Sequence, residues 1–180
     1  MRTILAALLV SASLLALAAP APAATVSGKT SVESALVQRI NAVRRSHGLR
    51  PLRVERGLTS AAERHAGSMG RAGYFRHELF TPSRSPRWNG FGRWIRWFYP
   101  GPGYRSWSAG ENLAWGAPGI SARRTVRLWL RSPGHRANLL ERSWRNVGVA
   151  AVRVQNGRGH FRRWDDVTIV VAEFGRRSAG

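Results

Sequence analysis

The order of the periodic segments constrains the fold more than any other feature of this sequence: helical patterns come first and strand patterns come last. Near the C-terminus, Val147, Val149 and Ala151 alternate with smaller or polar residues, and a β-branched run covers residues 167–174. Two strands are too few for a free-standing sheet, so we expect a further strand around residues 111–115. Helices followed by antiparallel strands are typical of an α+β fold built in layers.

Three helices are expected before the two C-terminal strands. Residues 30–33 (Thr-Ser-Val-Glu) place a hydroxyl three residues before a carboxylate, which is the capping-box pattern of a helix N-terminus, and residues 60–63 repeat it. Apolar residues then recur at helical spacing, and Gly48 and Gly73 are expected to end the two helices. A third helix is expected to begin at Ser121.

The first 23 residues have the three-part pattern of a secretory signal peptide. A basic start at Arg2 precedes an apolar run over residues 4–19, and small residues at 21–23 supply a cleavage site. The run is shorter than the roughly 20 residues that a membrane-spanning helix needs. We therefore expect cleavage near Ala23 and secretion from the cell, with an uncleaved N-terminal anchor as the alternative.

The remainder of the chain is long enough for one domain with its own core and short for two. We expect a frayed linker over residues 24–33, the domain over residues 34–176 and a tail over residues 177–180. Because the chain has no cysteine, packing rather than disulfides must stabilise it. The expected state is a monomer.

The chain is strongly basic, with 29 Lys and Arg residues against 9 Asp and Glu and a formal net charge of +20. Such a charge attracts anionic surfaces in a salt-dependent way. An anionic cell-envelope polymer, a lipid or a protein is therefore the expected class of partner, with the chain at a membrane surface rather than within it. No nucleic-acid-binding module is visible, so we expect no specific nucleic-acid partner.

Residues 81–109 combine prolines, glycines and arginines with four tryptophans, and no period holds across them. This pattern predicts a long structured loop. The tryptophans Trp88, Trp94, Trp97 and Trp107 allow two interpretations. They contact a sugar or a membrane interface while arginines attract phosphate or carboxylate groups, or they fold back and close the mouth of a cavity.

Three short segments stand out by their order and spacing: Gly-Tyr-Phe-Arg-His at 73–77, Ala-Gly-Glu-Asn-Leu-Ala at 109–114, and Trp-Leu-Arg-Ser-Pro-Gly-His-Arg-Ala-Asn-Leu-Leu at 129–140. With the flanking helix and strand segments, they resemble the CAP superfamily of cysteine-rich secretory, antigen 5 and pathogenesis-related proteins, in its short bacterial form. The resemblance implies a three-layer α-β-α sandwich with a central, mostly antiparallel sheet and a central cavity.

In this family, two histidines and two acidic residues line the cavity. The resemblance places the two histidines at His77 and His135 and the first acid at Glu111. The second acid would fall in the third helix just after Trp129, where residues 130–132 are Leu, Arg and Ser. The set is therefore incomplete, and family membership implies a fold and a cavity without establishing an activity.

Two imidazoles and one carboxylate are a reasonable ligand set for a divalent metal with an open water position, and zinc is the first expectation. A water on zinc can become a nucleophile near neutral pH. The alternative is a structural polar cavity, in which His77, Glu111 and His135 satisfy one another by hydrogen bonds.

Three functional hypotheses follow. The leading one is a secreted binding or structural module, acting at the cell envelope or outside the cell, with no catalytic residues. The second is a metal-assisted hydrolase that uses the same cavity, with His or Glu as general base. The third is a cationic, membrane-active antimicrobial protein that acts through the segment rich in Trp and Arg.

Three other residues receive an interpretation. His65 shares the inner face of the second helix with Ala61 and Met69, which favours a packed core histidine. Glu173 lies in the terminal strand and could face either the core or solvent. Ser132 is expected to cap the turn that follows it, since the sequence contains no hydrolase elbow motif that would make it a nucleophile.

Overall fold

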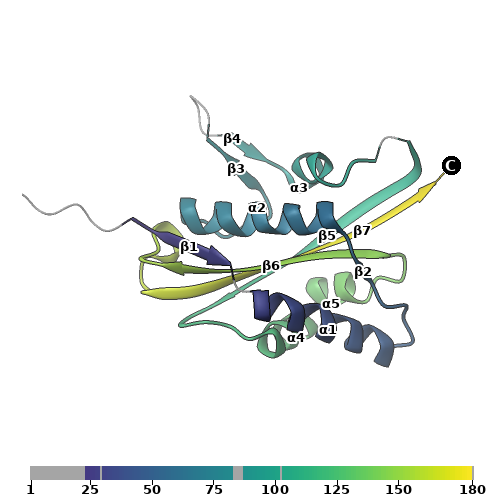
Figure 1. The fold of residues 1–180 in the computed structure, drawn as a ribbon, viewed down its shortest axis with the longest axis horizontal. Helices are drawn as coiled ribbons and strands as arrows, with labels where there is room; N and C mark the ends of the chain where they lie inside the picture. The colour runs from purple at the N-terminus through teal and green to yellow at the C-terminus, as the bar shows by residue number, and fades with distance from the viewer. Residues whose placement is uncertain (1–22, 29, 83–86, 102, 180) are drawn as a thin grey trace, which may run out of the picture.

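The computed structural model describes residues 23–28, 30–82, 87–101 and 103–179, so the predicted signal peptide lies outside the described residues except for Ala23. The main helices are α1 (Thr30–Ser46), α2 (Arg56–Ala72), α4 (Ala122–Arg131) and α5 (Pro133–Leu139). Figure 1 shows α2 on one face of the central sheet and α1, α4 and α5 on the other. The expected α-β-α sandwich is confirmed, and we call its two sides the α2 face and the α1 face.

The central sheet consists of five strands: β1 (Thr25–Gly28), β2 (Arg53–Val54), β5 (Tyr104–Gly116), β6 (Asn146–Gln155) and β7 (Asp166–Ala179). Their order is β1-β6-β7-β5, and β2 pairs in parallel with the start of β6. The other pairings are antiparallel. β5 therefore forms an edge of the sheet, and it contains the strand expected around residues 111–115.

The register of three neighbouring strands decides which residues meet beneath α2. Glu111 of β5 lies opposite Glu173 of β7, and Glu173 lies opposite Gly148 of β6. Cross-strand partners share one face of a sheet, so both carboxylates lie on the α2 face. Position 148 is a glycine because a Cβ there would collide with the backbone of Leu58, in the first turn of α2.

The second helix begins earlier than its capping pattern predicted. Its N-cap is Glu55, whose carboxylate accepts a hydrogen bond of 2.7 Å from the amide of Leu58, so residues 60–63 lie inside the helix. Gly73 ends α2 as expected: it adopts a left-handed φ of 69° and its amide donates to the carbonyl of Met69. This turn directs the following residues back toward the sheet.

The first and third helices begin where their caps were expected. α1 begins at Thr30, but Glu33 does not close a capping box: its carboxylate accepts a 2.9 Å hydrogen bond from the backbone amide of Ala151 in β6 and so ties the helix to the sheet. Before α4, the hydroxyl of Ser121 accepts a 3.3 Å hydrogen bond from the amide of Arg124.

Alternate residues of the strands supply an apolar core on each face. On the α1 face, Leu36 and Ile40 of α1 and Trp129 of α4 pack against the strands. On the α2 face, Ala62, Ala66 and Met69 pack against a separate set of strand residues. Burial on both faces explains why the C-terminal run reads as nearly continuous apolar sequence.

Two of the expected boundaries differ from the secondary structure. Residues 24–33 are not a frayed linker, because β1 pairs with β6 and α1 begins within this range. Residues 177–180 are not a separate tail, because β7 continues to Ala179 through its pairing with β5. The pairing that orders these two ends involves distant strands, which no local pattern reveals.

The segment 81–109 is also more ordered than a single loop. It contains a hairpin of β3 (Leu79–Thr81) and β4 (Arg87–Asn89), the short helix α3 (Phe91–Trp94), the 3-10 turn η1 (Ile95–Trp97) and the first part of β5. Figure 1 shows the hairpin and α3 on the outer side of α2. A second 3-10 turn, η2 (Gly159–Phe161), lies between β6 and β7.

Within the described ranges, no helix is both long enough and apolar enough to cross a membrane.

Candidate functional site

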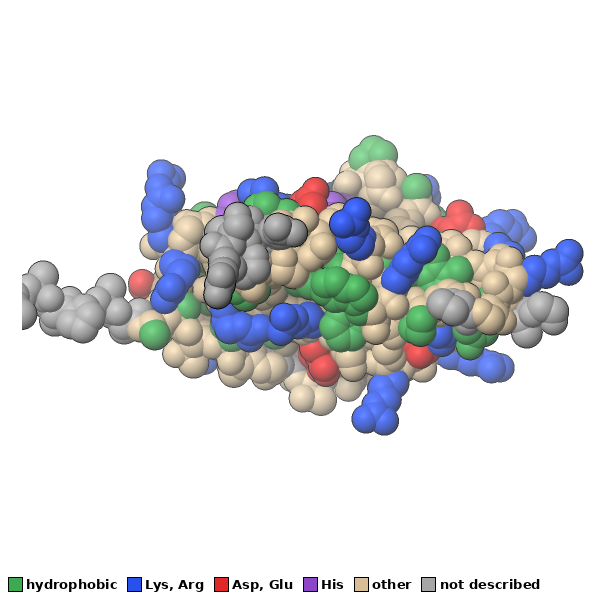
Figure 2. All heavy atoms as spheres, turned by 90° about the horizontal axis from the view of Figure 1, so that it is seen from above, with side chains coloured by type: hydrophobic (Ala, Val, Ile, Leu, Met, Phe, Trp, Pro, Cys, Tyr) green, Lys and Arg blue, Asp and Glu red, His purple; other side chains and the backbone are tan. Residues whose placement is uncertain are grey.

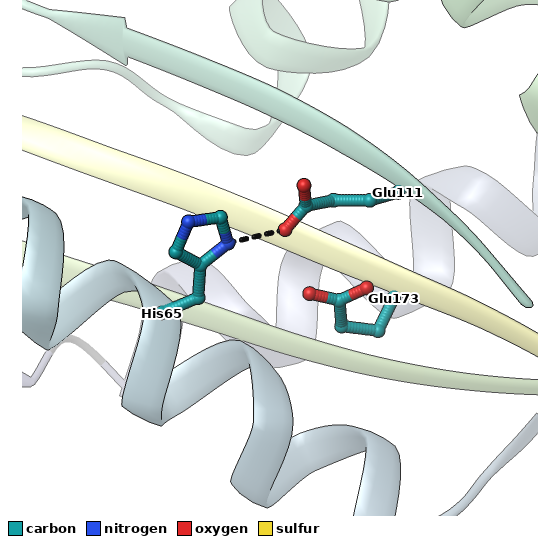
Figure 3. Close-up of side chains that lie close together, drawn as sticks. All are labelled: His65, Glu111 and Glu173. Atoms are coloured by element: carbon teal, nitrogen blue, oxygen red, sulfur yellow. Dashed lines mark hydrogen bonds and ion pairs between the residues drawn. The ribbon is translucent and has the colours of Figure 1, made fainter. Parts of the chain in front are cut away.

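Glu111 is the centre of the candidate site. It lies on the edge strand β5, and its side chain is almost completely buried. One carboxylate oxygen accepts a hydrogen bond of 2.5 Å from Nδ1 of His65, and the other accepts one of 2.6 Å from Nδ1 of His77. Figure 3 shows the contact between His65 and Glu111. The carboxylate is therefore held between two imidazoles from different parts of the chain.

The two imidazoles reach Glu111 by different routes. His65 lies on the inner side of α2 and is completely buried, with the ring of Trp94 packed edge-on against it at a centroid distance of 4.9 Å. His77 follows the turn at Gly73, and its carbonyl accepts a 3.2 Å hydrogen bond from the indole of Trp94. The His77 side chain is 52% exposed, so it forms the border between the buried group and solvent.

The hydrogen bonds from the two histidines keep Glu111 ionised. Burial opposes its ionisation, but the hydrogen bonds from His65 and His77 outweigh burial and lower the pKa of Glu111 below its ordinary value. In return, the hydrogen bond from Glu111 raises the pKa of His77, against the opposing effect of burial. Since Nδ1 of His77 donates to Glu111, Nε2 is the nitrogen that this residue has left for a ligand.

His135 reaches the same place from the opposite layer. It belongs to α5, on the α1 face, and it lines an open cleft of about 450 Å³ together with His77 and Glu111. Its backbone carbonyl accepts a 3.0 Å hydrogen bond from Asn112, whose side-chain oxygen in turn accepts one of 3.0 Å from Asn138. Partial burial lowers the pKa of His135, and the neighbouring His77 lowers it further.

The position of β5 explains how two layers build one cleft. Because β5 is the edge strand, residues from either side of the sheet can meet around its free edge. His77 approaches from the α2 face and His135 from the α1 face, and both line the cleft beside Glu111. All three residues predicted from the sequence thus lie around one opening.

The compact group of possible metal-ligating side chains is a different one. Among the described residues, His65, Glu111 and Glu173 each offer one donor atom, and these atoms lie within 4.8 Å of one another. His65 was predicted to be a packed core histidine, and it is fully buried, but it also contacts Glu111. Glu173 faces the core. Its place beside Glu111 follows from the register of β5 against β7, which the sequence pattern alone does not give.

No carboxylate stands at residues 130–132, where the family resemblance placed the second acid. The second carboxylate beside Glu111 comes instead from β7, as Glu173. Ser132 is the N-cap residue of α5 by its backbone, but its side chain makes no capping hydrogen bond. The expectation that its hydroxyl caps the following turn was therefore wrong, and Ser132 lies on the lining of the cleft.

The four tryptophans do not act alike. Trp94 is fully buried and Trp107 donates a 2.6 Å hydrogen bond to the carbonyl of Tyr99, which fits the interpretation that some rings fold back. Trp88 is 44% exposed and Trp97 is 60% exposed. The segment therefore closes over the core at two of its rings and presents the other two to solvent.

Comparison with known proteins agrees with this architecture. The sequence profile of the cysteine-rich secretory protein family, CAP, matches residues 37–174. The uncharacterized protein YkwD of Bacillus subtilis is 32% identical over 131 residues, which cover 71% of this chain and 46% of YkwD. This chain thus spans about half the length of that relative.

Solved structures give the same fold. An outer surface protein of Borrelia burgdorferi superimposes with a TM-score of 0.65 at 20% identity, covering 86% of this chain and 100% of its own. An extracellular protein of Bacillus anthracis that contains an SCP domain superimposes with a TM-score of 0.61 at 22% identity, covering 82% of this chain and 41% of its own. At these identities the likeness concerns the fold alone.

The three-layer sandwich with its cleft at the sheet edge defines a CAP-type domain. The chain belongs to the CAP family.

Proposed function

We propose that this protein is a secreted binding module that acts at the cell envelope or outside the cell. The observation that carries the proposal is the cleft at the edge of β5, where His77 and His135 flank Glu111. The carboxylate of Glu111 is buried and accepts two hydrogen bonds from histidines. An open cleft with a few fixed polar groups is typical of a ligand site. His77 and His135 are the residues that would contact a polar or acidic group of the ligand.

The chemistry of the cleft also suits zinc. Histidines that bind zinc commonly donate their second ring nitrogen to a carboxylate, which orients the ring, and Glu111 accepts such a bond from His77. His77 and His135 would hold the ion, with Glu111 in support. A bound zinc would polarise an oxygen of the ligand.

Secretion is part of the proposal and is supported by the sequence of the first 23 residues. They combine a basic start, an apolar run and small residues at the end. The structural relatives are described as an outer surface protein and an extracellular protein. Those descriptions concern the relatives, and they agree with the location proposed for this chain.

The surface supports an anionic partner. Figure 2 shows the side of the molecule that carries α2 and the β3–β4 hairpin, where basic side chains project widely and acidic ones are few. On the same segment, Trp88 and Trp97 expose their rings, and the guanidinium of Arg76 lies 4.6 Å from the Trp88 ring centroid. Aromatic rings beside arginines suit the sugar rings and acidic groups of a wall polymer.

Retention of the purified chain on insoluble cell-wall material tests the proposal. We expect the double variant H77A/H135A to lower the affinity by roughly thirtyfold, because two hydrogen bonds of about 1 kcal/mol each are lost. His47→Ala, an exposed histidine far from the cleft in sequence, is the matched control and should bind like the wild type.

Equal retention of the double variant and the wild type would show that the cleft is not the binding site. Release of soluble wall fragments that requires both histidines would replace the binding module by the hydrolase hypothesis. Leakage from anionic vesicles that weakens with salt and persists in the double variant would favour the membrane-active hypothesis.

A further inference from the structure

Beneath the cleft lies a group of buried side chains that the proposed binding function does not use. Glu111 and Glu173 face each other across β5 and β7, and His65 approaches them from α2. Figure 3 shows the three side chains directed toward one another, with the carboxylate of Glu173 turned toward the space beside His65 and Glu111. Both glutamates and the histidine are buried, Glu173 and His65 completely.

This group contains donor atoms without partners. Both carboxylate oxygens of Glu173 and Nε2 of His65 are buried and have no hydrogen-bond partner among the described residues. Leaving a buried polar group unpaired costs about 1–3 kcal/mol, and nearly all buried polar atoms in folded proteins are paired. Nε2 of His65 lies on the side of the ring away from the carboxylates, and Nδ1 faces Glu111 (Figure 3). The unpaired carboxylate of Glu173, beside Glu111 and this imidazole, therefore points to a species that binds there.

The charge of the group indicates a cation. Two carboxylates side by side in a buried site repel each other, and a cation or a proton must compensate one of them. Without a cation, burial raises the pKa of Glu173 well above its ordinary value, and the charge of Glu111 and a proton shared with Glu111 raise it further. A divalent ion would allow both carboxylates to ionise.

The donor set and its size select the kind of ion. The donor atoms of the three residues lie within 4.8 Å of one another. Zinc bonds to imidazole and carboxylate at about 2.0–2.2 Å, which separates tetrahedral ligand atoms by about 3.3–3.6 Å. The 2.5 Å contact between His65 and Glu111 would therefore open as Nδ1 of His65 gives up its proton to solvent, and Glu173 would move closer. Calcium and magnesium prefer six or more oxygen ligands, which this group does not supply.

We propose that His65, Glu111 and Glu173 form a buried site for a divalent transition-metal ion, with zinc as the ion of choice. The site lies behind the cleft, and Glu111 is the residue that the two share, since it also lines the cleft. In this arrangement the metal fixes the orientation of Glu111 from within, while His77 and His135 face the opening. The buried site is separate from a zinc held by the two cleft histidines.

Zinc titration of the full chain after removal of metal with a chelator tests this site, with calorimetry for affinity and cobalt absorption for the ligand field. We expect Glu173→Gln, which keeps the shape of the side chain, to lower zinc affinity by roughly a hundredfold. The double variant H77A/H135A, which removes any zinc held by the cleft histidines, should still bind one equivalent of zinc that Glu173→Gln does not bind. Glu63→Gln, an exposed carboxylate on the outer side of α2, is the matched control.

Each other result has a defined meaning, provided that circular dichroism and cooperative unfolding show a folded variant. Affinity lost in H77A and H135A but kept in E173Q would overturn the buried site and assign the ion to the cleft. No stoichiometric binding by the wild type would also overturn it, and would mean that Glu173 carries a proton instead. Neither result affects the retention test of the cleft, so the two proposals can fail independently.

Discussion

The two faces of the central sheet differ in how their buried polar side chains are hydrogen-bonded. Asn112 and Glu111 are neighbours on β5 and point to opposite faces. On the α1 face, the side-chain amide of Asn112 donates to the carbonyl of His135 and accepts from Asn138, so both its nitrogen and its oxygen have hydrogen-bond partners. On the α2 face, Glu173 and His65 bury polar atoms that the described residues leave unpaired. The α1 face also buries single unpaired atoms, on Arg44 and Thr168. Among the described residues, however, an unpaired carboxylate beside a second carboxylate and a histidine is found on the α2 face.

The largest expected effect concerns the core of the α1 face. Trp129 is 1% exposed, and its indole donates a 2.9 Å hydrogen bond to the carbonyl of Leu113. Trp129→Ala should destabilise the fold by about 3–5 kcal/mol, because it opens a large cavity in the α1-face core. Urea unfolding at neutral pH measures this effect. Trp129→Phe keeps most of the volume and should cost much less, and similar losses in both would contradict the cavity explanation.

The next effect concerns Glu111, which lies on the α2 face and also lines the cleft. Glu111→Gln replaces an ionised acceptor of two imidazole hydrogen bonds by a neutral amide and should cost about 2–3 kcal/mol. Glu63→Gln at an exposed position should change stability by less than about 0.5 kcal/mol. If both variants unfold at the same urea concentration, the hydrogen bonds of Glu111 contribute nothing to stability.

The same variant changes the pH dependence of the cleft. Because Glu111 raises the pKa of His77, the stabilisation from this pair is full below the ordinary histidine value of 6.5 and is lost as pH rises through the folded-state value. In E111Q the pKa of His77 should fall, and proton NMR titration of the imidazole checks this. An unchanged titration of His77 would show that Glu111 does not set its charge.

The smallest effect has the opposite sign and isolates the unpaired acid. The raised pKa of Glu173 means that the folded state keeps a proton which the unfolded state releases above about 4.5, so wild-type stability falls as pH rises beyond that value. With chelator present, Glu173→Gln should therefore stabilise the protein by ~1 kcal/mol at pH 8. The gain in stability should vanish below the ordinary pKa of a glutamate. A gain that is equal at all pH values would exclude ionisation of Glu173 as its cause.

Local sequence signals predicted part of the fold. The glycine that ends α2, the serine before α4 and the alternation in β6 all rest on contacts between residues close in sequence, and each was found as expected. The N-cap at Glu55 was missed because residues 60–63 also match a capping pattern. In the folded chain these residues lie inside α2. The order within residues 81–109 was missed because its burial depends on α2, as the packing of Trp94 on His65 shows.

The candidate site divides in the same way. The family motifs led to His77, Glu111 and His135, since each lies in a short, recognisable segment. His65 and Glu173 carry no such motif. The function of Glu173 depends on its position opposite Glu111, which only the strand pairing reveals, and that of His65 depends on the packing of α2 against the sheet.

The location of the cleft at the free edge of β5 has a mechanical consequence. His77 is carried by the layer that contains α2, and His135 is carried by the layer that contains α5. A ligand that contacts both imidazoles therefore fastens the two helical layers to each other across the rim of the sheet. In a chain without cysteine, such a ligand acts as a reversible cross-link, and it stabilises the whole domain against unfolding by an amount that grows with the ratio of its concentration to its Kd.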